Sequence, residues 1–178
     1  MSGLFLTTTS SEETMRIGAL VAQVCASGDI IALEGELGAG KTQFVRGLAR
    51  GLGLNERRVS SPTFVTVQEY WPEEDEKKLV LVHIDAWRMD GGGDELEAIG
   101  WGHEGAQLRR GAVVAVEWPS RMGKALGRDF LEVRLSHGAN ETRQIFMVGF
   151  GAFERKIQPL LAALRSTGFE PQIQEETV

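Results

Sequence analysis

The sequence predicts an α/β fold of three layers, in which helices cover both faces of a largely parallel central sheet. Apolar runs of strand length alternate along the chain with helical patterns, as in βαβ units. Three of these runs, residues 29–34, 79–85 and 112–117, are apolar almost throughout, which is typical of strands buried on both faces. A glycine-rich loop and a helical apolar stripe follow the first run directly. The order of strand, loop and helix predicts the P-loop NTPase version of this fold.

Length and composition set the class of protein. A chain of 178 residues with 42% hydrophobic and 25% charged residues is expected to form a single globular domain over residues 1–178. No apolar run approaches the roughly 20 residues of a spanning helix, so we expect no membrane association. The net charge of -6 argues against autonomous binding to nucleic acid, because that binding depends on cationic groups.

The single cysteine and the N-terminus indicate the compartment. Cys25 cannot form an internal disulfide, and the N-terminus lacks a basic region followed by an apolar core. We therefore expect a cytoplasmic protein, in which Cys25 is a packed side chain rather than a reactive thiol.

The first helix is predicted from its start signal and its apolar stripe. Ser10 and Ser11 precede Glu13 and Thr14, a pattern typical of a helix N-terminus, and the stripe continues to about Ser27. The strand 29–34 follows, and a second helix is expected over residues 42–50, with Gly53 as its stop.

The rest of the chain alternates strands, turns and short helices. We expect, in order, a loop entering a strand (59–70), an acidic turn (71–78), a strand (79–85), short helices (94–110), a strand (112–117), an antiparallel C-terminal hairpin (130–136 and 143–148), a last helix (153–165) and a loose tail from about residue 168.

The loop from Gly35 to Thr42 has the complete pattern G-x-x-x-x-G-K-T of a phosphate-binding loop. Its glycines let main-chain N–H groups point inward, and the helix that follows directs its positive end at the anion. Lys41 is predicted to reach the β- and γ-phosphates and Thr42 to give its hydroxyl to Mg²⁺. The predicted nucleotide contacts are Gly35, Gly38, Ala39, Gly40, Lys41, Thr42 and Gln43.

Two acidic residues stand at the ends of the other buried strands. Asp85 closes the run 79–85 and Glu117 closes the run 112–117. Parallel strands end at one edge of a sheet, so both carboxylates are expected beside the phosphate loop, where they would hold Mg²⁺ or position water. Thr63 follows Pro62 in a segment that either senses the γ-phosphate through the metal or is only a turn feeding a strand.

Two further side chains near these strand ends have more than one interpretation. For His83 we favour a packed core or network histidine over a metal ligand, because no second His or Cys stands at ligand spacing. Trp118 either packs beneath a loop or presents its face to a partner or base, and the sequence leaves both open.

Four segments together resemble the TsaE family, the small bacterial ATPases of tRNA threonylcarbamoyladenosine synthesis. They are residues 35–42, Ser61-Pro62-Thr63-Phe64, His83-Ile84-Asp85-Ala86-Trp87-Arg88 and Glu117-Trp118-Pro119. The resemblance runs from about Ser11 to the end of the hairpin and leaves the tail beyond Arg165 outside. The family commonly has Tyr where this chain has Trp87, a change of aromatic that retains Asp85 and Arg88.

The resemblance implies a cytoplasmic, Mg²⁺-dependent ATPase that is weak alone. It would associate with the TsaB and TsaD proteins, the two-subunit threonylcarbamoyl transferase, and support modification of adenosine 37 in tRNAs reading codons that begin with A. The protein would contact the tRNA only indirectly, through those partners. By the same resemblance Thr42 and Glu117 form the Mg²⁺ site, Asp85 is the Walker-B-like acid, Thr63 is the switch residue and Trp118 is a functionally sensitive neighbour. The family layout also brings Ser11 towards the base.

Two other classes of phosphate-loop protein are alternatives. A small-metabolite kinase is the alternative, with Arg121, Lys124 and Arg128 as a possible lid. A regulatory GTPase is disfavoured because the guanine-reading Asn-Lys-x-Asp pattern is absent.

Overall fold

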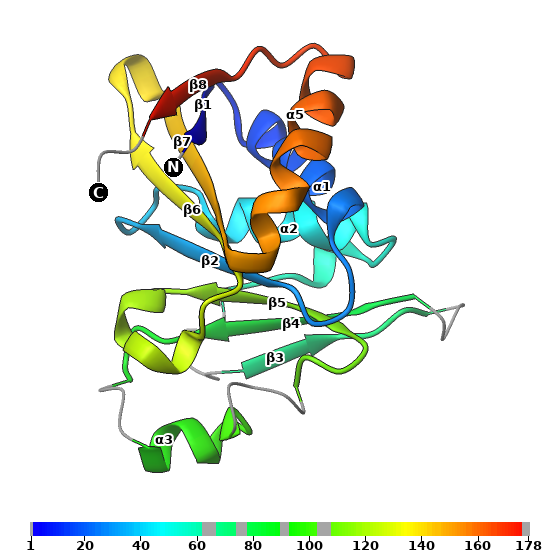
Figure 1. The fold of residues 1–178 in the computed structure, drawn as a ribbon, viewed down its shortest axis with the longest axis vertical. Helices are drawn as coiled ribbons and strands as arrows, with labels where there is room; N and C mark the ends of the chain where they lie inside the picture. The colour runs from blue at the N-terminus through cyan, green and yellow to red at the C-terminus, as the bar shows by residue number, and fades with distance from the viewer. Residues whose placement is uncertain (1, 62–66, 74–77, 90–92, 103–107, 176–178) are drawn as a thin grey trace.

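A computed structural model describes residues 2–61, 67–73, 78–89, 93–102 and 108–175. Within these ranges eight strands form one sheet in the order β3-β4-β5-β2-β6-β7-β1-β8 (Figure 1). The strands are β1 (Ser2–Thr8), β2 (Ile30–Gly35), β3 (Val67–Tyr70), β4 (Val80–Asp85), β5 (Ala112–Glu117), β6 (Phe130–His137), β7 (Arg143–Phe150) and β8 (Gln172–Glu175). The α-helices are α1 (Ser11–Val24), α2 (Lys41–Gly51), α3 (Gly93–Ala98) and α5 (Ile157–Ser166).

The sheet is mixed, which confirms the α/β class and corrects the expectation of a largely parallel sheet. Among the described strands, only the central ones, β4, β5, β2 and β6, pair in parallel. The pairs β3·β4, β6·β7, β7·β1 and β1·β8 are antiparallel. The predicted C-terminal hairpin is confirmed as β6 and β7, whose connection is too short for the crossover that a parallel pair requires.

The two chain ends extend the sheet beyond what the sequence predicted. β1 pairs with β7 on one side and with β8 on the other, so residues 172–175 are not the loose tail expected after Gly168. All four side chains of β8 are exposed, and the strand is held by main-chain pairing that leaves no hydrophobic pattern. β1 was missed because its buried hydrophobic residues, Leu4 and Leu6, form too short an alternation.

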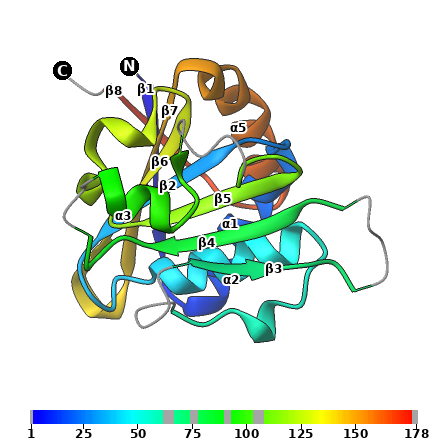
Figure 2. The same ribbon diagram turned by 90° about the horizontal axis from the view of Figure 1, so that it is seen from below.

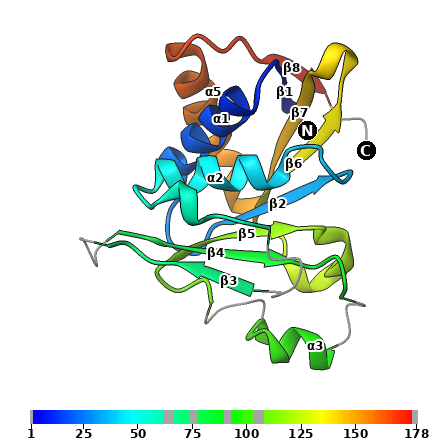
Figure 3. The same cartoon turned by 180° about the vertical axis from the view of Figure 1, so that it is seen from behind.

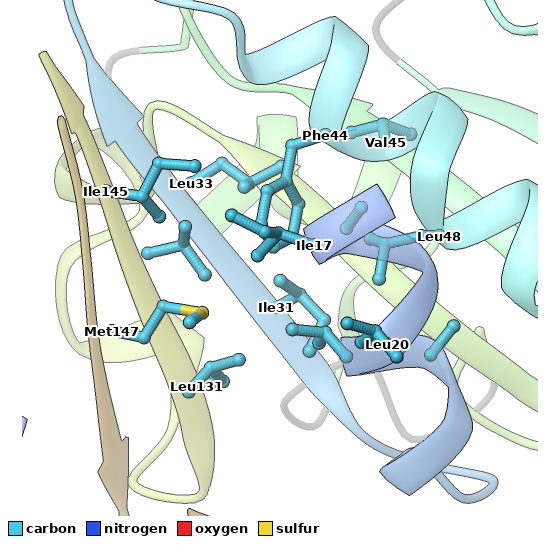
Figure 4. Packing of buried hydrophobic residues seen from close by; sticks show 14 of the residues in the cluster. Ile17, Leu20, Ile31, Leu33, Phe44, Val45, Leu48, Leu131, Ile145 and Met147 are labelled. Carbon is cyan, nitrogen blue, oxygen red and sulfur yellow. The ribbon is translucent and has the colours of Figure 1, made fainter. Parts of the chain in front are cut away.

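Two hydrophobic clusters cover the two faces of the sheet. Alternate residues of β2 point to opposite sides: Ile31 and Leu33 pack against α1, α2 and α5, whereas Ile30 and Ala32 join a cluster that contains Trp101. Figure 4 shows the first cluster, with Phe44 of α2 between helix and sheet. α3 lies on the other side of the sheet (Figure 2). The predicted three-layer arrangement follows from this two-sided burial.

The helix boundaries agree closely with the sequence pattern. The Ser10 side chain caps α1 by accepting a hydrogen bond from the Glu13 N–H at 3.1 Å, and Gly53 follows α2 with φ of 73°. The last helix begins as a 3-10 segment (151–156) before α5. None of the described helices is both long and apolar enough to cross a bilayer.

Cys25 packs at the end of α1, as expected. Its thiol donates a hydrogen bond to the Val21 carbonyl oxygen at 3.2 Å. Burial, with a smaller contribution from the Asp29 carboxylate, raises the pKa of Cys25 to about 12. Because the thiolate is the reactive form, this thiol is unreactive near neutral pH.

Glycines allow α1 and α2 to approach closely, a contact that neither helical pattern predicts. A Cβ on Gly18 would overlap the Phe44 carbonyl oxygen, and one on Gly47 would overlap the Met15 carbonyl oxygen. Figure 3 shows the two helices side by side over the sheet. Since α2 begins at Lys41, this contact fixes the position of the helix that follows the phosphate loop.

We expect the substitution Gly47→Ala to destabilise the protein by about 1–3 kcal/mol, as overpacked cores do. The added methyl group meets main-chain atoms of α1, which cannot rotate away as a side chain can, and this outweighs the roughly 1 kcal/mol that Ala gains in helix propensity. Urea denaturation measures the free energy of unfolding. Gly102→Ala is the control, because a Cβ there meets no described atom within 4 Å. An unchanged or raised stability of Gly47→Ala would contradict the predicted overlap.

Candidate functional site

The loop between β2 and α2 is shaped by glycines at its two ends. Gly35 ends β2 where a Cβ would overlap the Leu135 carbonyl oxygen of β6. Gly40 is the N-cap of α2 and has φ of 107°, a left-handed conformation that other residues rarely adopt. Ala39 is a buried residue within the loop, and its N–H donates to the Glu36 carbonyl oxygen at 3.2 Å. The loop is therefore a fixed turn at the N-terminus of an 11-residue helix.

Lys41 is held in place by the loop itself. Its Nζ donates to the carbonyl oxygens of Gly35 at 2.7 Å and Glu36 at 3.0 Å. Burial lowers the pKa of Lys41, and the nearby carboxylates of Glu117, Glu34 and Asp85 oppose that shift. The side chain is only 5% exposed. The ammonium group is thus a partly desolvated cation that an incoming anion would stabilise.

Asp85 and Glu117 are brought together by the register of the sheet. They are Cα partners at the ends of β4 and β5, and Glu117 is also the partner of Leu33 in β2. Both side chains are buried, and the edge where they lie is the one from which the phosphate loop leaves β2. The predicted convergence of these three segments is therefore what the structure shows.

Hydrogen bonds connect Glu117 to the loop helix and to β4. Its Oε1 accepts from Thr42 Oγ1 at 3.2 Å and lies 2.9 Å from His83 Nε2. Asp85 uses Oδ1 to accept from the Trp87 N–H at 2.9 Å, which fixes the turn that follows β4. The two carboxylates thus have different partners although they lie side by side.

A cavity of about 970 Å³ opens at this edge of the sheet. The predicted site residues that line it are Gly35, Gly38, Gly40, Lys41, Thr42, Gln43, Asp85 and Glu117, and its other lining residues are Glu34, Glu36, Leu37, Ser61, Trp87 and Trp118. The volume is in the range of small-molecule and cofactor sites. Thr63 lies outside the described residues.

Ser11 lies in a neighbouring pocket of about 450 Å³ rather than in the main cavity. This pocket is also lined by Thr14 and Arg143, and it shares Gly38, Gly40 and Gln43 with the main cavity. A ligand that follows the loop could therefore extend from one pocket into the other.

Trp118 covers the lysine at the mouth of the main cavity. Its backbone is left-handed (φ 60°, ψ 49°), an uncommon conformation for an aromatic residue. Lys41 Nζ lies 4.0 Å from the centroid of the Trp118 ring. The centroids of the Trp87 and Trp118 rings are 4.6 Å apart. Trp118 thus packs over the loop, and Trp87, which is 47% exposed, presents the outer face of the pair.

The donor set suits Mg²⁺ bound together with phosphates. Thr42, Glu117 and Asp85 offer the oxygen atoms that this ion prefers. Within the described parts of the chain, no three His, Cys, Asp or Glu side chains form a group that would hold a metal by itself. The residues therefore fit an ion that shares its coordination with a nucleotide.

Comparison with known proteins decides the family. The family model described as "Threonylcarbamoyl adenosine biosynthesis protein TsaE" matches residues 8–145. The chain belongs to the TsaE family. This confirms the resemblance drawn from the four sequence segments.

Individual TsaE relatives agree with this assignment. The tRNA threonylcarbamoyladenosine biosynthesis protein TsaE of Bacillus subtilis is 35% identical over 144 residues, which cover 81% of this chain and 84% of the relative. The protein of the same name from Streptomyces coelicolor is 36% identical, with 76% and 89% covered. The crystal structure of YdiB from Bacillus subtilis superposes with a TM-score of 0.69 at 28% identity, covering 94% of this chain and 97% of YdiB.

Within this TsaE-family chain, sequence reasoning missed three features of the site. It did not place His83 against Glu117, Trp87 against Trp118 or Ser11 in a separate pocket. His83 and Glu117 are separated by 34 residues, and only the pairing of β4 with β5 brings them together. The one available signal was the spacing His83-x-Asp85, which puts both side chains on the same face of a strand.

Proposed function

We propose that this chain is an ATP-binding and ATP-hydrolysing protein with the P-loop NTPase fold, which supports threonylcarbamoylation of adenosine 37 in tRNAs reading codons that begin with A. The observation that carries the proposal is the grouping of Lys41, Thr42, Asp85 and Glu117 around one cavity. The relatives are named tRNA threonylcarbamoyladenosine biosynthesis proteins, and these names indicate the pathway of tRNA modification.

The proposed roles follow from the chemistry of each group. Main-chain N–H groups of the loop and the Lys41 ammonium bind the phosphates, and the N-terminus of α2 adds its positive field. Thr42 and Glu117 hold Mg²⁺, with Asp85 as the Walker-B-like acid. When bound, Mg²⁺ neutralises charge that develops on the phosphates. The role of Thr63 as a switch residue is part of the same proposal.

The adenosine part of the ligand would occupy the smaller pocket. That pocket continues from the loop through Gly38, Gly40 and Gln43 and is lined by Ser11 and Arg143. Its polar side chains suit a ribose and a base that leave the phosphates in the main cavity.

The proposed partners are the TsaB and TsaD proteins, in the cytoplasm. The net charge of -6 disfavours direct binding to RNA, so this chain would contact tRNA through the transferase. The alternative of a small-metabolite kinase is less well supported, because Lys124 and Arg128 do not line the cavity and Arg121 stacks on Trp87, with Cζ 5.5 Å from its centroid.

The test measures ATP hydrolysis by the purified chain with Mg²⁺, alone and with the TsaB–TsaD pair, together with threonylcarbamoyladenosine formed on tRNA. We expect slow hydrolysis alone, a rate changed severalfold by the pair, and tRNA modification that depends on ATP binding by this chain. Transfer of the γ-phosphate to a small acceptor would favour the kinase. Binding to the pair that is tight but indifferent to nucleotide would contradict the proposal.

A further inference from the structure

His83 is a completely buried histidine on β4, the strand beside the edge strand β3, close to the site but outside the cavity. It lies on β4 two residues before Asp85, so both side chains point to the same face, towards α2. Its Cα partner in β5 is Ala115, and Glu117 is the next residue of β5 on that face. The methyl side chain of Ala115 leaves space in which His83 and Glu117 meet diagonally across the two strands.

The hydrogen bonding of the imidazole is one-sided. Nε2 lies 2.9 Å from Glu117 Oε1, and among the described residues Nδ1 has no hydrogen-bond partner. An ionised carboxylate only accepts hydrogen bonds, so Nε2 carries the proton and donates it to this bond. A buried polar atom without a partner is unfavourable, and an apolar residue at this position would avoid that cost. The bond to Glu117 is therefore the specific interaction that this side chain contributes.

Neighbouring side chains pack near the imidazole and near its partner carboxylate. The Tyr70 ring of β3 lies beside it, with 6.5 Å between centroids and a tilt of 36°. Tyr70 is itself anchored, because its hydroxyl donates to Gln68 Oε1 at 2.6 Å. The same carboxylate oxygen that faces His83 also accepts from Thr42 Oγ1. His83 and Thr42 therefore hold Glu117 from two sides.

We infer that His83 is a positioning residue that fixes the Glu117 carboxylate against Thr42 and so prepares the site for Mg²⁺ bound with a nucleotide. The inference rests on the proposed function. Outer-shell partners of metal-ligating carboxylates orient them, and losing such a partner typically lowers metal affinity by about 10- to 100-fold. His83 acts through Glu117, without contact to the nucleotide.

Two amide variants provide a matched test. In His83→Gln the side-chain amide nitrogen takes the place of Nε2 and can still donate to Glu117, whereas in His83→Asn the shorter amide corresponds to Nδ1 and cannot reach it. Calorimetric titration with ATP, in Mg²⁺ and in EDTA, gives the factor by which Mg²⁺ strengthens binding. We expect His83→Asn to lower this factor about tenfold and His83→Gln to keep it within about threefold. Affinity in EDTA should be unchanged in both.

A double-variant cycle shows whether His83 acts through Glu117. In a Glu117→Gln background, His83→Asn should have no further effect on the Mg²⁺ factor. An unchanged factor in His83→Asn alone, or a full tenfold loss that persists beside Glu117→Gln, would overturn the inference. If the wild-type chain binds no ATP, or binds it without any help from Mg²⁺, the proposed function fails instead, and the wild-type titration alone reveals this.

Nitrogen-15 NMR of the wild-type imidazoles provides a second test that needs no stable His83→Asn protein. We expect His83 as the tautomer protonated at Nε2, with a resonance that shifts when Mg²⁺ is added to the ATP complex. His83→Gln assigns the signal among the three histidines. The opposite tautomer, protonated at Nδ1, would overturn the inference because Nε2 would then have no proton to give Glu117.

Discussion

Replacing Lys41 with Met is expected to weaken ATP binding by about 100-fold. Met retains the length of the side chain but removes the ammonium group, and hydrogen bonds to charged groups contribute about 1.5–3 kcal/mol each. Folding should not suffer: burial lowers the pKa of Lys41, which means that keeping the charge there already costs free energy. Calorimetric titration with ATP measures the affinity, and thermal unfolding measures the stability of the ligand-free protein.

Lys124→Met is the matched control, because Lys124 is exposed and does not line the cavity. This variant should leave ATP affinity unchanged. If Lys124 belonged to a kinase lid, the variant would lower ATP affinity. If Lys41→Met binds ATP as tightly as the wild type, the phosphate-loop interpretation is wrong.

The same lysine gives the affinity a pH dependence of known sign. Its pKa in the ligand-free protein lies below the ordinary value of 10.5 because the side chain is buried, so it loses its charge at a lower pH than a lysine with that ordinary value. ATP affinity should therefore begin to fall below pH 10.5 in the wild type, while the weak binding by Lys41→Met should lack this component.

Replacing Glu117 with Gln should separate metal binding from nucleotide binding. The variant keeps the shape of the side chain but loses the charge that faces Thr42 and His83. We expect the Mg²⁺-dependent part of ATP affinity to fall by about 10- to 100-fold, and hydrolysis by about 100-fold, with affinity in EDTA unchanged. Titration in Mg²⁺ and in EDTA, together with phosphate release, measures the three quantities.

Two further variants are compared with Glu117→Gln. Glu132→Gln removes the same charge on β6 outside the cavity and should have no effect on any of the three. Asp85→Asn tests the neighbouring acid, whose Oδ1 already accepts from the Trp87 N–H. If Glu117→Gln loses hydrolysis but keeps the full effect of Mg²⁺ on affinity, Glu117 positions water and is not a metal ligand.

The strands and helices nearest the site were predictable because local patterns encode them. The run 112–117 coincides with β5, and the loop 35–42 runs from the last residue of β2 into the first turn of α2, as its motif requires. The capping of α1 by Ser10 follows from residues only three positions apart. In each case the interactions that define the element lie within a few residues in the sequence.

The outer strands were not predictable in the same way. β8 is a fully exposed strand whose stability comes from pairing with β1 at the opposite end of the chain. The close approach of α1 and α2 depends on Gly18 and Gly47 facing each other's main chain, which neither helical pattern reveals. Both features depend on long-range contacts that leave no periodic pattern.

The sequence by itself predicted the glycine-rich turn over residues 35–42, the strand ends that carry Asp85 and Glu117, and the family, because these depend on residue type and short-range order. Only the tertiary structure decided that the sheet is mixed, that Ser11 lies in a second pocket and that His83 lies against Glu117. The physical reason is that each of these features depends on contacts between segments far apart in the sequence, such as the pairing of β4 with β5 that makes Asp85 and Glu117 Cα partners.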